Sequence, residues 1–521
     1  MFTINTTKFS RRSFMQRAGV VGIAGLTLPS WMPRMAFASL PENATNGDIL
    51  VCIFLRGAMD SLSAVVPYNE SHYYDSRPTI QIPDDKVLDL DGQFGFHPRM
   101  APLLEIWQQG DFGIVHAAGS PDPTRSHFTA MDYMERGTPG DKSVATGWIG
   151  RHLMTTAERN NSPFRAVGMG DRAQQSLRGP IPAVALKSIA DFHLQGRQRD
   201  VFEAQAALEN LYLIGQGNGA RYETYQMLSD GVDDTFEAVR MLENADPTQY
   251  TPQHGATYNM EDSFGRGLSQ IAQLIRADVG LEVACVDAGG WDTHEFMGTY
   301  DEGRMAGLLA NLAGNLNAFY TDMNDRMENI SVVVMSEFGR RAYENGSRGT
   351  DHGHGSCMFL MGRNIIGGNV YGNWPGLAPD NLDRGDLAVT TDFRDVLSEV
   401  VELRLRNPAL ADVFPNYNAN YLGVAGAPAP LDGASAAPAI ALTTTDPRFS
   451  TPMLTGELTE NSDAETDDFL DELMMEEEAT EVLPDEQMLD DEVPGVDLLT
   501  ETADEVYTGT QIRHVYLPVI R

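Results

Sequence analysis

Five short apolar runs are the feature that most constrains the fold of this chain. Each is rich in β-branched or large apolar side chains and largely lacks polar alternation: Ile49–Leu55, Phe112–Ala117, Val283–Val286, Ser331–Met335 and Ser356–Met361. Segments with helical periodicity lie between them, including Met100–Gln108, Phe128–Arg136, Asp200–Ile214, Phe264–Arg276 and Met305–Met327. Strands buried on both faces and separated by helices predict an α/β fold, with a mostly parallel sheet and helices on both of its faces.

The domain organisation follows from shifts in composition along the 521 residues. We expect an α/β domain over residues 39–424, with a helical insertion at about 139–278 where strand-like runs are scarce. After residue 424 the chain becomes rich in Ala, Pro and Thr and then strongly acidic, so we expect residues 425–506 to be a disordered acidic tail. The last residues, 507–521, are apolar again, and we expect either a short strand or a docking peptide there.

The N-terminus resembles an export signal. Ser10-Arg11-Arg12-Ser13-Phe14 precedes the weakly apolar stretch 18–28, and Ala36-Phe37-Ala38 offers a small-x-small cleavage site. This pattern is typical of a twin-arginine signal peptide over residues 1–38; an amphipathic helix with a chance arginine pair is the alternative. We therefore expect a periplasmic or extracellular protein. No uninterrupted apolar run reaches about 18 residues, so no integral membrane span is expected after cleavage.

Charge and cysteine content exclude several functional classes. The net charge is −37, of which −21 belongs to residues 457–505 and −16 to the rest. An acidic chain of this kind does not suit a nucleic-acid partner, because binding to phosphates requires cations. Three cysteines cannot form a disulfide framework, and each sits in an apolar run, so we expect buried strand residues.

Two glycine-flanked clusters carry the candidate metal ligands. Gly290-Trp291-Asp292-Thr293-His294 follows the run that ends at Val286, and in an extended segment Asp292 and His294 point to the same side. Asp351-His352-Gly353-His354-Gly355 comes just before the run that begins at Ser356. Carboxylates with imidazoles suit zinc, manganese or iron. Ligands in parallel α/β sheets bind beyond the carboxyl ends of the strands, where these clusters are expected.

Two carboxylates follow other predicted strands. Glu337 stands at the end of the run 331–335, where an unpaired carboxylate would be costly, so metal ligation or pairing with Arg340 or Arg341 is expected. Asp60 follows the first run, and its alternative role is to cap a helix that starts near Leu62.

The candidate nucleophile follows the second strand. Gly119-Ser120-Pro121-Asp122-Pro123-Thr124-Arg125-Ser126-His127 leads into a helical segment. A hydroxyl at a helix N-terminus lies where backbone N–H groups favour an anion, so Ser126 could attack a phosphate or sulfate ester. Ser126 is equally well explained as an ordinary helix cap.

These motifs resemble those of a known family. Arg56-Gly57-Ala58-Met59-Asp60, Arg125-Ser126-His127-Phe128, Gly290–His294, Ser336-Glu337-Phe338-Gly339-Arg340 and Asp351–Gly355 are similar to the successive motifs of the exported family catalogued as domain of unknown function 1501. That family is placed in the alkaline phosphatase and sulfatase superfamily, and the resemblance spans roughly residues 47–424.

The resemblance implies a set of site residues. Asp60 matches the first metal-binding Asp, and Ser126, or less well Thr124, matches the nucleophile. Asp292 and His294 resemble an Asp-x-x-x-His pair at shorter spacing. Glu337 can replace the Asp of an Asp-His-Gly motif, whereas Phe338 cannot replace its His; His352 or His354 is expected to supply that imidazole. One well-formed metal site is implied, and a second metal is in doubt.

Two functional hypotheses follow. The first is an exported, metal-dependent hydrolase of phosphate or sulfate esters acting on a small-molecule or polysaccharide substrate. Its nucleophile is Ser126, Arg125 clamps the oxyanion, and a divalent cation of unknown identity is bound by Asp60, Asp292, His294, Glu337, Asp351, His352 and His354, with Asp351 as ligand or orienting partner. The second is a non-catalytic envelope protein that keeps the fold and a structural metal. The sequence specifies neither the oligomeric state nor the substrate.

Overall fold

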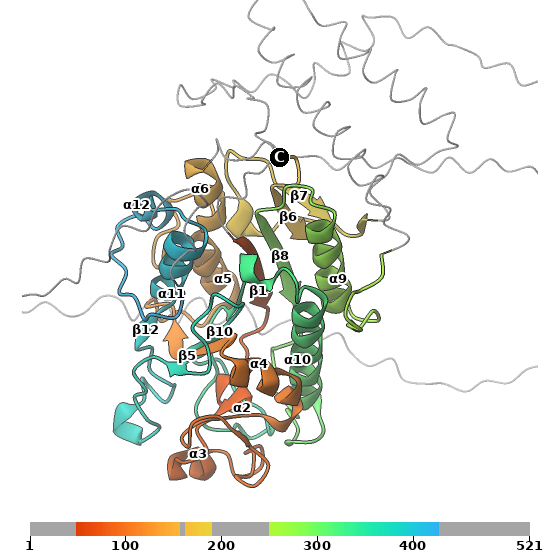
Figure 1. Ribbon diagram of the computed structural model, residues 1–521. Helices are drawn as coiled ribbons and strands as arrows, with labels where there is room; N and C mark the ends of the chain where they lie inside the picture. Colours follow the sequence, from red (N-terminus) through yellow and green to blue (C-terminus); the bar gives the residue numbers. More distant parts are fainter. Residues whose placement is uncertain (1–47, 157–161, 190–249, 427–521) are drawn as a thin grey trace, which may run out of the picture. The chain divides into compact units, whose positions relative to one another are not determined.

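A nine-stranded sheet runs through the protein (Figure 1). The computed structural model describes residues 48–156, 162–189 and 250–426, all within one compact unit of the chain. The strands lie in the order β11-β5-β10-β9-β1-β8-β6-β7, and β12 also pairs with β5. Their bounds are β1 Ile49–Leu55, β5 Phe112–Gly119, β6 Ala166–Met169, β7 Val184–Leu186, β8 Val283–Ala288, β9 Ile330–Ser336, β10 Ser356–Met361, β11 Val370–Tyr371 and β12 Thr391–Asp392.

The sheet is parallel except at β10. β1 lies at its centre and pairs in parallel with β8 on one side and β9 on the other, with Cys52 opposite Cys285 and Val333. β10 runs antiparallel to both β9 and β5. Because β10 runs the other way, its first residues lie at the edge where the parallel strands end. Residues just before β10 therefore meet residues just after β1, β8 and β9.

Helices cover both faces of the sheet, as the sequence predicts (Figure 1). Val51, Ile53 and Leu55 of β1 face a core that α4, α9 and α10 complete. The alternate residues Leu50, Cys52 and Phe54 face a second core with α5, α6 and α11. The helices are α4 Leu104–Gln109, α5 His127–Arg136, α6 Trp148–Thr155, α9 Ser263–Arg276, α10 Arg304–Asp322 and α11 Phe393–Glu399. A π-helical turn, Val400–Arg404, extends α11, and a short α12, Leu410–Val413, follows.

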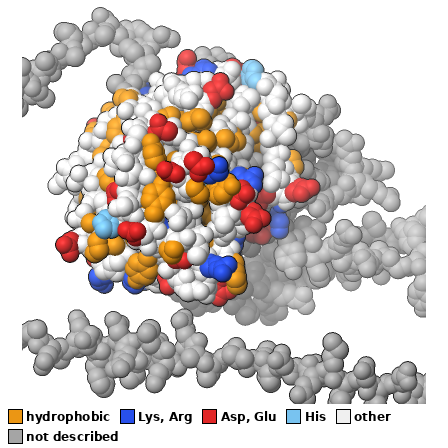
Figure 2. Space-filling model, turned by 90° about the horizontal axis from the view of Figure 1, so that it is seen from below, with side chains coloured by type: hydrophobic (Ala, Val, Ile, Leu, Met, Phe, Trp, Pro, Cys, Tyr) orange, Lys and Arg blue, Asp and Glu red, His pale blue; other side chains and the backbone are white. Residues whose placement is uncertain are grey.

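Small elements cover the carboxyl edge of the parallel strands. β1 leads through a tight turn into α2, Ser61–Ala64, and then into a three-stranded sheet of β2 Val65–Val66, β4 Gly95–Phe96 and β3 Leu88–Asp89. α3, Ser71–Ser76, lies beside them, at the bottom of Figure 1. Figure 2 looks at the molecule from this side and shows acidic, basic and hydrophobic side chains interspersed over the face.

The region 139–278 differs from the helical insertion expected there. It contributes α6 and α9, but also β6 and β7 at one edge of the main sheet. These strands are only four and three residues long, too short for an apolar run to stand out. The part of this region at residues 190–249 lies outside the described residues, as do the predicted signal 1–38, nearly all of the acidic tail and the segment 507–521.

None of the described helices combines the length and the apolar character needed to cross a bilayer.

Candidate metal centre

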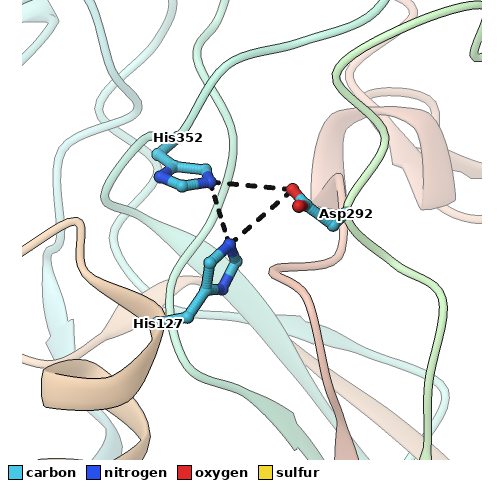
Figure 3. Close-up of side chains that lie close together, drawn as sticks. All are labelled: His127, Asp292 and His352. Carbon is cyan, nitrogen blue, oxygen red and sulfur yellow. Dashed lines mark hydrogen bonds and ion pairs between the residues drawn. The ribbon is translucent and has the colours of Figure 1, made fainter. Parts of the chain in front are cut away.

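Three side chains from separate parts of the chain converge at the carboxyl edge of the sheet (Figure 3). One ligand atom each of His127, Asp292 and His352 lies within 4.8 Å of the other two. His127 Nε2 is 2.9 Å from His352 Nε2, and Asp292 Oδ1 is 3.7 Å from His127 Nε2 and 3.6 Å from His352 Nε2. His294 extends the group: its Nε2 is 2.9 Å from His352 Nε2 and 3.1 Å from Asp292 Oδ1.

Each of these residues lies next to an end of a strand or at the start of a helix. His127 is the first residue of α5, after the loop that follows β5. Asp292 and His294 lie in the loop after β8, and His352 lies just ahead of the antiparallel β10. The parallel sheet with one reversed strand therefore brings all four to one edge.

Glycines let the site loops pack backbone to backbone. Gly57 adopts φ +114°, and a Cβ there would lie 2.5 Å from the backbone nitrogen of Asp292. A Cβ on Gly349 would lie 2.2 Å from the carbonyl oxygen of His294. Only glycine fits at both positions. These glycines thus have a packing role, because they allow close backbone contact with the loop that carries Asp292 and His294.

A carboxylate lies behind two of the imidazoles. His127 Nδ1 is 2.8 Å from Glu337 Oε1, and His294 Nδ1 is 3.1 Å from Asp351 Oδ1. Carboxylate partners of this kind fix the tautomer and the ring orientation of metal-binding histidines. Glu337 is fully buried and also accepts hydrogen bonds from the Gly57 backbone N–H and the Ser336 hydroxyl.

The two carboxylates determine where the imidazole protons lie. Burial opposes ionisation of Glu337, but hydrogen bonds from His127 and from backbone N–H groups outweigh it and lower its pKa. Burial likewise opposes ionisation of Asp351, and hydrogen bonds from Asn345 and His294 outweigh it and lower its pKa. Ionised carboxylates only accept, so each contact places a proton on Nδ1, and in the neutral imidazole Nε2 is then the nitrogen with the lone pair.

The lone pairs make the cluster suited to a cation. His352 Nε2 faces the lone pairs of His127 and His294 and can donate at most one proton. Burial and the nearby Arg340 lower the pKa of His352 to about 4, so this imidazole is neutral at pH 7. Ligands about 2.0–2.1 Å from a tetrahedral zinc would be about 3.3 Å apart, close to the separations of 2.9–3.7 Å observed here. The residues present fit a divalent transition metal.

Arg340 ties the centre to the surrounding backbone. Its buried guanidinium donates to the carbonyls of Ala58 and Thr350, at 2.8 and 3.0 Å, and to that of Gly57. It also forms an ion pair with Asp292 Oδ1. Burial opposes ionisation of Asp292, but the hydrogen bond and charge of Arg340 outweigh it and lower the Asp292 pKa. Asp292 is thereby held ionised, in the form that binds a cation.

The family of the chain is evident from its sequence profile. Residues 93–397 match the family described as "Protein of unknown function (DUF1501)". The chain belongs to this family. The resemblance noted from the motifs is therefore confirmed. No curated protein sequence matches the DUF1501 chain.

Several solved structures are similar to this DUF1501 protein at low sequence identity. The C-terminal periplasmic domain of EcEptC from Escherichia coli, in complex with Zn, is 10% identical, with 74% of this chain and 92% of that chain covered and a TM-score of 0.31. The PsFucS1 sulfatase from Pseudoalteromonas sp. is 10% identical, and the match covers 73% of this chain and 70% of that chain with a TM-score of 0.30. Alkaline phosphatase from the Antarctic bacterium TAB5 is 10% identical, and the match covers 61% of this chain and 92% of that chain with a TM-score of 0.24.

Several of the residues predicted for the site of this DUF1501 protein do lie together. Asp292, His294 and His352 form the cluster with His127, and Glu337 and Asp351 contact its histidines from behind. Glu337 was expected either to bind a metal or to pair with Arg340 or Arg341; in the structure its carboxylate contacts His127, Gly57 and Ser336. Asp351 has the orienting place that was one of its two expected roles.

Asp60 lies outside the cluster. Its two oxygens are 2.6 and 3.1 Å from the Arg77 guanidinium, and both residues are buried. Asp60 also accepts from the Leu62 backbone N–H at the start of α2, which is the capping role weighed as its alternative.

His354 is also engaged elsewhere. Its Nδ1 is 3.0 Å from Asp383 Oδ2 and its Nε2 is 2.9 Å from the Ser120 carbonyl oxygen. It points across to the loop after β5, and His352 is the member of the pair that joins the cluster.

The residues expected for catalysis lie next to the cluster in the chain. Ser126 is exposed and precedes α5, and its hydroxyl does not cap that helix. Thr124 Oγ1 accepts from the Ser126 backbone N–H at 3.3 Å. Arg125 forms an ion pair with the fully buried Asp386. Phe338 packs its ring 5.0 Å from the His127 ring and 5.2 Å from the His352 ring, measured between centroids.

His127 is the residue that the sequence reasoning missed. In the sequence it stands only as part of the loop that carries Ser126. Its position in the chain could have indicated it as a ligand. His127 is an imidazole at the first position of a helix that follows a buried strand, at the sheet edge where the other candidates were expected.

Proposed function

We propose that this protein is an exported, metal-dependent hydrolase of phosphate or sulfate esters. The observation that carries the proposal is the convergence of His127, Asp292, His294 and His352, with carboxylates behind two of the imidazoles. A bound divalent cation would supply Lewis acidity, neutralising charge that develops on the ester oxygens.

Ser126 is the proposed nucleophile. It immediately precedes His127, so its Cα is about 3.8 Å from that of a ligand residue. It is exposed and its hydroxyl does not cap α5, which leaves the oxygen free to approach an ester held at the cluster. Attack by the Ser126 oxygen on phosphorus or sulfur would form a bond to the enzyme and release the alcohol, and water would then cleave that bond.

Arg125 is the proposed oxyanion clamp. Its partner Asp386 is fully buried, and a part of the Arg125 side chain remains exposed. One of its guanidinium nitrogens is held by the ion pair, and we propose that the remaining donors bind an anion beside Ser126.

A second candidate is a non-catalytic envelope protein with a structural metal. Two observations favour it: Asp60 is committed to Arg77, and Phe338 fills the space beside two imidazoles where a further ligand would be useful. Such a protein would use its acidic segment or C-terminal peptide for attachment.

Metal analysis and an ester panel separate the two candidates. The purified protein is loaded with zinc or manganese, its metal content is measured, and aryl phosphates and aryl sulfates are tested with the wild type, Ser126→Ala and Asp292→Asn. A hydrolase loses turnover in both variants but loses metal only in Asp292→Asn. Metal binding without turnover of any ester by the wild type would favour the structural candidate.

Export through the twin-arginine route is proposed from the N-terminal sequence. Replacing Arg11 and Arg12 with Lys is expected to leave the protein uncleaved in the cytoplasm, because the apolar stretch of the signal is short and weak. Cell fractionation and N-terminal sequencing test this, and normal processing of the variant would remove the assignment.

A further inference from the structure

Two large aromatic side chains adjoin the metal centre and are exposed. Phe128 directly follows the ligand His127 and is 85% exposed, and Phe296 lies two residues after the ligand His294 and is 72% exposed. They are the two most exposed large hydrophobic residues in the described part of the chain. By chain connectivity their Cα atoms lie within about 4 and 7 Å of those of the two ligand residues.

The backbone at Phe296 is strained, and its neighbours hold it there. Phe296 has φ +45°, a left-handed conformation that costs a bulky L-residue roughly 1–2 kcal/mol. Its N–H donates to the Ser347 carbonyl at 3.0 Å, and the next N–H, of the buried Met297, donates to the Arg348 carbonyl at 2.9 Å. Phe296 is thus presented to solvent by an ordered loop. Strained residues of this kind cluster at active sites, ligand-binding sites and switch regions.

Phe128 is placed by the helix that begins at His127. It lies in the first turn of α5, one residue after His127, so its side chain is turned by about 100° around the helix axis from the imidazole. Its backbone therefore adjoins that of His127, and its exposed ring projects from a neighbouring side of the helix. The metal centre itself is open: the side chains of Asp292 and His294 are 47% and 38% exposed, so a ligand can reach them from solvent.

We infer that Phe128 and Phe296 bind the non-reacting part of the substrate, and that this part is a ring-shaped or otherwise apolar group. This inference rests on the proposed function. Faces of aromatic side chains stack on aryl rings and on the apolar faces of sugar rings. The substrate class is thereby narrowed to esters of a cyclic or aryl alcohol, in preference to small aliphatic esters or inorganic anions.

Binding of non-hydrolysable ligands tests the inference without relying on turnover. Phenylphosphonate and methylphosphonate, and the matching phenyl- and methanesulfonates, are titrated into the metal-loaded protein by calorimetry. The two members of each pair share the anionic group and differ in the ring. We expect the phenyl compound to bind about five- to tenfold more tightly, and Phe128→Ala with Phe296→Ala to reduce that preference to near one while leaving methylphosphonate affinity unchanged.

A matched control and a stability measurement complete the test. Met260→Ala removes an exposed large side chain from a loop that contributes no ligand, and it should leave the phenyl preference intact. Phe296→Asn should keep or raise the melting temperature, because Asn tolerates the left-handed backbone, and yet should lower the phenyl preference.

The outcomes are distinguishable. Equal binding of the phenyl and methyl compounds to the wild type, or an unchanged preference in the double variant, overturns this inference and leaves the proposed function standing. Failure of every phosphonate and sulfonate to bind the metal-loaded protein overturns the proposed function and the inference together.

Discussion

Glu337 Oε1 lies 2.8 Å from His127 Nδ1, although 210 positions separate the two residues in the chain. The contact joins the end of β9 to the start of α5, and it sets the tautomer that turns the His127 Nε2 lone pair toward His352 and Asp292. Glu337 would therefore act on a bound cation through His127.

The first prediction concerns this contact. Glu337→Gln keeps the size of the side chain but no longer supplies a charged acceptor, so His127 is free to turn or to change tautomer. We expect the affinity for zinc to fall about 10- to 100-fold, measured by competition with a chelator of known affinity. Glu261→Gln, at an exposed position, is the control and should leave the affinity unchanged. Unaltered zinc affinity in Glu337→Gln would show that the carboxylate does not orient a ligand.

The second prediction concerns the close approach of Gly57 to Asp292. Gly57→Ala places a methyl group 2.5 Å from the Asp292 backbone nitrogen, at a left-handed φ. We expect the free energy of unfolding to fall by about 3–5 kcal/mol and the metal affinity to fall with it, because Asp292 must move.

Gly92→Ala separates the two causes. Gly92 also has a positive φ, but nothing lies within 4 Å of a Cβ built there. It should lose about 1–2 kcal/mol from backbone strain alone, with full metal affinity. Equal losses of stability in both variants would contradict the clash. Urea unfolding and metal titration supply the two measurements.

The main strands could be predicted from the sequence because each is a continuous apolar run buried on both faces. β11 and β12 could not be predicted, because each is only two residues long and pairs with a single strand, β5. The antiparallel direction of β10 was equally hidden, because an apolar run carries no information on strand direction.

The candidate site was predictable only in part, for a related reason. Local spacing indicates that Asp292 and His294 point to the same side. It does not reveal which carboxylate will form an ion pair with a Lys or Arg that is distant in the sequence. Asp60 follows a strand as convincingly as Asp292 does, yet Arg77, 17 residues further on, pairs with it inside the core. Such pairings are decided by tertiary contacts.

The third prediction follows from that pairing. Asp60→Asn leaves the buried Arg77 without its counter-ion, so the free energy of unfolding should fall by about 3–5 kcal/mol. Metal content, measured per folded chain by elemental analysis, should stay at the wild-type value because Asp60 is not in the cluster. Asp292→Asn is the comparison and should lose metal. Loss of metal from folded Asp60→Asn would instead restore Asp60 as a ligand.

The fourth prediction concerns His116, which is buried in β5 with Nε2 3.1 Å from the Val65 carbonyl oxygen. Burial lowers the pKa of His116 to about 4, against 6.5 for the ordinary imidazole. Above pH 6.5 neither the folded nor the unfolded state is protonated there, so His116 adds no pH dependence. Between pH 6.5 and 4 only the unfolded state takes up the proton, so stability falls as the pH falls, by up to about 3 kcal/mol in total.

In His116→Gln the unfolding free energy should therefore depend less steeply on pH across this range. The difference in bound protons between the unfolded and folded states should be smaller by up to one, whatever the effect of the substitution on stability at pH 7. The measurement is urea unfolding from pH 4.5 to 7.5 with a chelator present, so that metal binding by the other histidines does not contribute. His72→Gln, at an exposed position on α3, should keep the wild-type slope. A His116→Gln slope equal to that of the wild type would mean that the imidazole becomes protonated in the folded protein, and that its burial does not hold it neutral.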